Sequence, residues 1–179
     1  MGELEHWHDF YILVGTAGAT LLALLFVAVS LGAGFLSDTH TAPTRAFYSP
    51  VIVHFTSVFF ISAVALFPSH KPAFFAVLIG ATAVIGAVVS VLVTVALLTH
   101  DWTNYKEDRL AYGLLPIAGY AALFAAAVMI VQGVEYALDV LAGALLLLLI
   151  VNIRNAWDLT LSMVRRQTAR EQEKRKRKS

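Results

Sequence analysis

Long apolar runs separated by short polar links dominate this chain. Windows of about 19 residues predict five helices, over residues 10–36, 47–67, 72–98, 110–131 and 135–157. About 20 consecutive apolar residues suffice to cross a hydrocarbon layer roughly 30 Å thick. The pattern therefore predicts an all-α integral membrane protein with five transmembrane helices.

The links between these helices are short, for example PSHKP and QGV, and short links place consecutive helices side by side and antiparallel. We therefore expect an up-and-down bundle. The second span is the weakest, because Pro50 lies near its start and His54 lies within it. If that segment is re-entrant, the count falls to four spans and the N-terminus changes side.

Composition supports one compact bundle and no separate soluble domain. Of the 179 residues, 59% are hydrophobic and only 14% are charged, against about 25% charged in soluble domains. We divide the chain into a transmembrane domain, residues 1–162, and a basic tail, residues 163–179. Cysteine is absent, which excludes disulfides, thiolate metal sites and a cysteine nucleophile.

The tail fixes the expected orientation. Residues 163–179 carry eight Lys or Arg against two Glu, a net charge of +6. Lys and Arg near span ends favour the cytoplasmic side, so we expect the tail to be a cytoplasmic basic helix that contacts anionic lipids. With five spans, a cytoplasmic C-terminus places the N-terminus outside. We expect no nucleic-acid binding, because no folded reader domain accompanies the tail.

Polar residues return at the end of the fifth span, within NIRNAWDL. Arg154 and Asp158 are four apart, so they share a helix face and form an expected structural ion pair where the membrane ends. Asn152 and Asn155 lie deeper. Amides there need partners, so we expect both to face protein or a wet cavity.

His54 lies at a depth similar to that of Asn152 in this arrangement. One interpretation is a neutral histidine hydrogen-bonded to a neighbouring helix, with Ser57 one turn on. The other is a gate or a proton-sensitive site, because histidine titrates near neutral pH.

Small residues recur at intervals of four in the third span, at Thr82, Gly86, Ser90 and Thr94. Such a stripe is typical of close helix packing. The alternative is a hydroxyl-lined permeation path, since the stripe crosses most of the bilayer.

An acidic rim is expected at the outer face, formed by Asp9, His70, Glu135 and Asp139. Carboxylate and imidazole are common metal ligands, but their spacing favours a solvated rim that attracts cations. We expect no metal, no cofactor and no enzymatic activity, because no catalytic motif is present.

The segments FYILVGTAGATLLALLFVAVSL and NIRNAWDL resemble short, functionally uncharacterised multi-pass proteins of the bacterial inner membrane. The resemblance implies a location in the bacterial inner membrane, and it does not indicate any activity.

Two functions fit these observations. The first is a homo-oligomeric ion channel or small-solute pore, leading from Asp139 past the hydroxyl stripe to His54, Asn152 and Asn155. The alternative is a non-conducting accessory or assembly subunit bound to a different membrane protein. Small-residue faces and few buried charges suit such docking.

Overall fold

The computed structural model describes the backbone of residues 7–36, 42–67, 71–99 and 110–176. It describes the side chains of residues 7–28, 30, 50–67, 71–96, 98–99, 112–161 and 172. The α-helices of this part of the chain are α2 (His8–Leu36), α3 (Ala42–Ala65), α4 (Pro72–Thr99), α6 (Leu115–Gln132) and α7 (Ala137–Lys176). A π-helical turn, η1 (Leu110–Leu114), leads into α6. The described chain is all-helical, as predicted.

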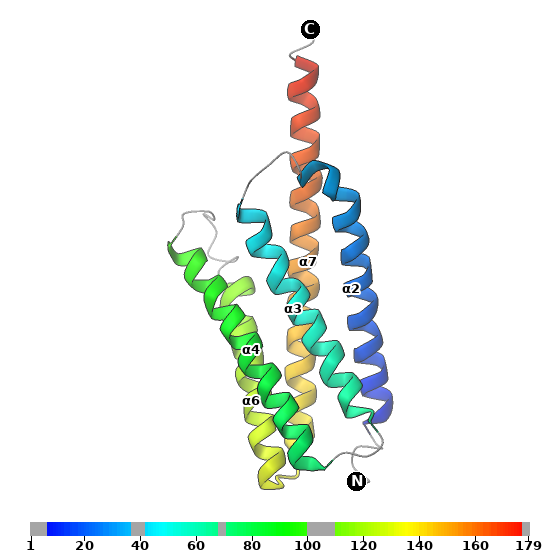
Figure 1. Ribbon diagram of the computed structural model, residues 1–179, viewed down its shortest axis with the longest axis vertical. Helices are drawn as coiled ribbons and strands as arrows, with labels where there is room; N and C mark the ends of the chain where they lie inside the picture. Colours follow the sequence, from blue (N-terminus) through cyan, green and yellow to red (C-terminus); the bar gives the residue numbers. More distant parts are fainter. Residues whose placement is uncertain (1–6, 37–41, 68–70, 100–109, 177–179) are drawn as a thin grey trace.

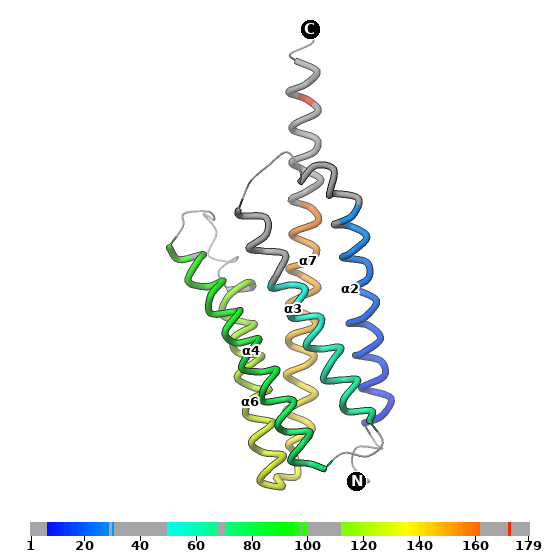
Figure 2. The backbone as a smooth tube through the Cα atoms, viewed as in Figure 1, coloured from blue at the N-terminus to red at the C-terminus, as the bar shows by residue number. Residues whose placement is uncertain are grey.

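Successive helices run in opposite directions (Figure 1). Helix α7 packs against α6, α3 and α2, whereas α4 packs against α6 and α3. Helix α3 crosses obliquely in front of α7, between α2 on one side and the α4–α6 pair on the other (Figure 2). Side chains of α3 therefore meet both α6 and α7.

Four helices are long and apolar enough to cross a membrane in the described part of the chain, which fits a helical multi-pass membrane protein. The apolar stretches are His8–Ala28, Pro72–Ala96, Tyr112–Gln132 and Ala137–Leu161. Helix α3 contributes a shorter apolar stretch, Pro50–Ala65. Its predicted crossing as a fifth span stays a prediction.

Gly133 makes the tight turn from α6 into α7. It has a φ of 70°, a conformation that a residue without Cβ adopts easily. Its N–H donates to the Ile130 carbonyl at 3.2 Å, and the Val134 N–H donates to the Met129 carbonyl at 3.1 Å. These bonds satisfy the last carbonyls of α6, so the two helices pack as antiparallel neighbours.

Close approaches at glycine hold the bundle together where the sequence predicts small-residue packing. A Cβ built on Gly86 would lie 2.0 Å from Cε1 and Cζ of Tyr120, so the Tyr120 ring fills the notch that this glycine leaves. Three further glycines make similar contacts: Gly15 against Ser62, Gly113 against Thr94, and Gly119 against Leu148. In lipid, such contacts replace the hydrophobic effect as a source of helix association.

Replacing Gly86 by alanine is expected to destabilise the bundle by about 1–3 kcal/mol, because the ring of Tyr120 must move out of a packed position. Gly143→Ala is the matched control, since a Cβ at Gly143 meets nothing within 4 Å. Unfolding in one detergent mixture measures both variants. Equal stabilities for the two variants would contradict the packing of Tyr120 on Gly86.

Candidate functional site

A buried polar layer joins three helices in the interior of the bundle. We define it as His54 and Ser57 on α3, Tyr120 on α6 and Asn152 on α7, all of which are buried. Helix α3 supplies two members because His54 and Ser57 are three residues apart and share one face. That face lies against α6 and α7, so these polar groups avoid lipid.

His54 contacts α6 through Tyr120. The Nδ1 atom of His54 lies 2.8 Å from the Tyr120 hydroxyl, and the two ring centroids are 5.4 Å apart at an interplanar angle of 50°. His54 is 2% exposed and Tyr120 is 0% exposed. Because an isolated buried polar group is costly in an apolar interior, each ring supplies the partner that the other needs.

The same hydroxyl group reaches a second α3 residue. Tyr120 donates to Ser57 Oγ at 3.1 Å, and Ser57 donates to the Val53 carbonyl at 2.8 Å. The chain of hydrogen bonds therefore runs from His54 through Tyr120 and Ser57 to a backbone carbonyl. A carbonyl oxygen only accepts, so the chain ends at Val53 on this side.

A hydrogen bond from Asn152 joins α7 to α3 within the same polar layer. Its Nδ2 donates to the Val51 carbonyl at 2.9 Å, and the side chain is fully buried. Val51 lies three residues before His54, within one helical turn. Asn152 of α7 is therefore bonded to the turn of α3 that carries His54.

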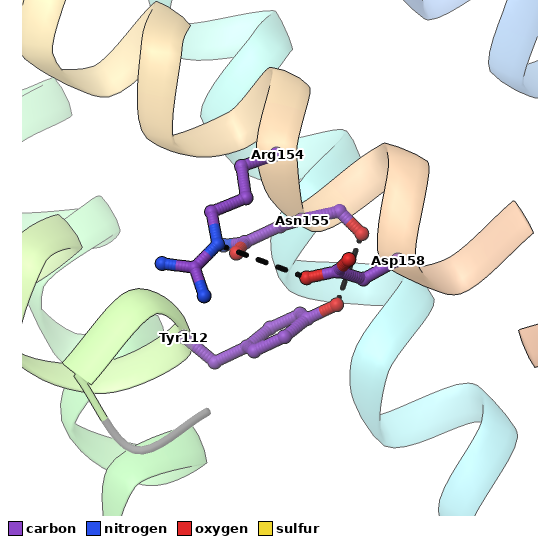
Figure 3. A network of polar contacts seen from close by, with 4 residues as sticks. All are labelled: Tyr112, Arg154, Asn155 and Asp158. Atoms are coloured by element: carbon purple, nitrogen blue, oxygen red, sulfur yellow. Dashed lines mark hydrogen bonds and ion pairs between the residues drawn. The ribbon is translucent and has the colours of Figure 1, made fainter. Parts of the chain in front are cut away.

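Asn155 lies one turn along α7 and is contacted by Tyr112 of η1. Tyr112 donates to the backbone carbonyl of Asn155 at 2.9 Å, and Figure 3 shows the Tyr112 ring beneath this turn of α7.

The predicted ion pair lies nearby on α7, where Arg154 Nε is 3.9 Å from Asp158 Oδ2 (Figure 3). Their side chains are 47% and 41% exposed, so this pair contributes little to stability.

The hydroxyl groups of the α4 stripe form hydrogen bonds within their own helix. Each of its hydroxyl groups donates to the carbonyl four residues earlier on α4 at 2.8 Å: Thr82 to Leu78, Ser90 to Gly86, and Thr94 to Ser90. The Tyr120 ring lies against Gly86 and separates the stripe from His54. At Gly86 the stripe packs closely against α6.

The predicted acidic rim is exposed where the structure describes it. Asp9, Glu135 and Asp139 are solvent-accessible, and His70 lies outside the described residues. No group of three or more His, Asp or Glu in the described chain is arranged to hold a metal ion.

Sequence reasoning overlooked Tyr120, which completes the polar layer. Tyr120 lies in GYAALFAAA, where its hydroxyl is the only polar side-chain group. A phenol buried among alanines needs a partner on another helix, and that signal identifies Tyr120 as a member of the layer. The local sequence does not indicate which helix supplies the partner.

Tyr120→Phe keeps the ring in the Gly86 notch but removes the hydroxyl group. The change leaves His54 and Ser57 without this buried partner, so we expect a loss of about 1–3 kcal/mol in the free energy of unfolding. Tyr136→Phe is the control, because Tyr136 is 63% exposed. A loss no larger than that of the control would mean that the hydroxyl group does not hold α3 to α6.

Comparison with protein-family models, curated proteins and solved structures found no match to this chain.

Proposed function

We propose that this chain is a non-conducting accessory or assembly subunit of a larger membrane protein complex. In this role the bundle is a rigid membrane-embedded body that docks against a different protein. The proposal ranks this role above the pore that the sequence favours.

The observation that carries the proposal is the way the buried polar groups are used. His54, Ser57 and Tyr120 bond to one another across α3 and α6, and Asn152 bonds to the α3 backbone. Polar side chains that line a conduction path contact the permeating ion or water, whereas these bond helix to helix. Interhelical hydrogen bonds of this kind stabilise a bundle.

The proposal includes five spans with an outer N-terminus, in the bacterial inner membrane. Helix α3 has 24 residues, about 36 Å at 1.5 Å per residue, which is long enough to cross the roughly 30 Å of hydrocarbon. The excess of Lys and Arg after residue 162 supports a cytoplasmic C-terminus that contacts anionic lipids.

A homo-oligomeric pore is the second candidate. The exposed carboxylates of Glu135 and Asp139, near the start of α7, favour it because they suit a cation-attracting mouth. Since Tyr120 fills the space beside Gly86, such a pore would run between copies of the bundle.

Native mass spectrometry of the protein, extracted gently from its own membrane, tests the proposal. We expect one copy in a fixed stoichiometry with a different membrane protein. In liposomes that contain the purified chain alone, we expect no cation flux above that of empty liposomes.

A closed homo-oligomer without other chains would contradict the accessory role. So would a cation flux that Asp139→Asn reduces, because that result would assign the rim to a conduction path. Asp158→Asn is the matched control for the flux assay, since it removes one exposed carboxylate elsewhere on α7.

A further inference from the structure

One face of helix α7 stays exposed along the length of its apolar stretch in the described bundle. Its exposed residues include Asp139, Gly143, Leu146, Ile150, Ile153 and Trp157. These residues follow one another at intervals of three or four, and such spacing places them on one stripe of an α-helix. We call this stripe the outward face of α7.

The outward face of α7 differs from the exposed side of α4. Helix α4, Pro72–Thr99, contains no charged residue, and its glycines, Gly80 and Gly86, are not exposed. The exposed side of α4 is therefore a continuous apolar surface, which suits lipid tails. The outward face of α7 instead presents an exposed carboxylate at Asp139 and an exposed glycine at Gly143.

Gly143 leaves an open notch in the outward face. Elsewhere in the bundle a side chain of another helix fills such a notch, as Tyr120 does at Gly86 and Leu148 does at Gly119. A Cβ built on Gly143 meets nothing within 4 Å, so packing inside the described bundle does not require glycine there. Small residues let a second helix approach closely in a membrane, and the notch is shaped for that approach.

Charged side chains lie toward both ends of the outward face. Asp139 lies in the first turn of α7, and Arg154, at the edge of the face, is 47% exposed beside Asp158. Arg154 precedes the end of the apolar stretch at Leu161 by about 10 Å of helix. Charges inside a span almost always face protein or water, so a protein cover suits this face better than lipid tails do.

We propose that the outward face of α7 binds a transmembrane helix of the partner protein, and this inference rests on the proposed accessory role. The partner helix places a large apolar side chain in the notch at Gly143. It carries a Lys or Arg at its outer end, because a cation there complements the carboxylate of Asp139. Ile150 and Trp157, which are 63% and 64% exposed, supply the apolar contact toward the opposite end of α7.

Photo-crosslinking in the native membrane tests which molecule covers this face. The photoreactive amino acid p-benzoylphenylalanine replaces Ile150, and Val88 on α4, which is 52% exposed, is the matched control position. After irradiation, mass spectrometry identifies the cross-linked peptides. We expect position 150 to capture a transmembrane segment of a different protein with a Lys or Arg at its outer end, and position 88 to capture lipid. Capture of lipid alone, or of a second copy of this chain, at position 150 would overturn the inference.

Gly143→Leu fills the notch and is expected to weaken binding of the partner about tenfold or more, because the two helices can no longer pack closely. The stability of the bundle itself is expected to stay unchanged, since Gly143 faces open space. Ala81→Leu is the matched control, because it adds a similar side chain at an exposed position of α4. Asp139→Lys brings two cations together and is expected to weaken binding as well.

Native mass spectrometry of these variants separates the docking face from the accessory role. A fixed complex of the unsubstituted protein that Gly143→Leu and Asp139→Lys both leave intact would overturn the docking face and keep the accessory role. An unsubstituted protein without any heterologous partner would overturn both.

Discussion

The contact between Tyr120 and His54 is the interaction on which the arrangement of the bundle depends. The Tyr120 ring fills the notch at Gly86 on α4, and its hydroxyl group lies 2.8 Å from His54 Nδ1 on α3. One side chain of α6 therefore packs on one helix and bonds to another. Lipid offers neither hydrogen bonds nor a hydrophobic driving force between helices, so a residue that supplies both shape and polarity fixes three helices at once.

Helix α3 needs this anchoring more than its neighbours do. Its described apolar stretch, Pro50–Ala65, is the shortest among the helices compared for membrane crossing, and it contains buried His54, Ser57 and Ser62. A helix of this composition gains less from lipid than Leu- and Val-rich α4 does. Hydrogen bonds to Tyr120 and from Asn152 offset the cost of its polar groups, and the same bonds orient those groups inward.

The apolar pattern of the sequence predicts much of the fold, but it does not predict which residues pair across helices in the polar layer. Run length and short links predict the helices and their antiparallel order, and the interval of four at Gly86 indicates close packing. Depth counted along each helix places His54 and Asn152 at one level. The rotation of α6 about its axis is set by packing against two neighbours, so the sequence does not show that Tyr120 reaches His54. Nor does it show that the hydroxyl groups of α4 bond to their own carbonyls.

A double-mutant cycle between His54→Leu and Tyr120→Phe tests most directly whether this contact couples α3 to α6. The free energy of unfolding is measured for the unsubstituted protein, both single variants and the double variant under one set of bilayer conditions. We predict a coupling energy of about 0.6–1.7 kcal/mol, which spans the average and the maximum found for interhelical hydrogen bonds in membranes. Additive losses, with a coupling energy near zero, would contradict the claim that this hydrogen bond holds the two helices together.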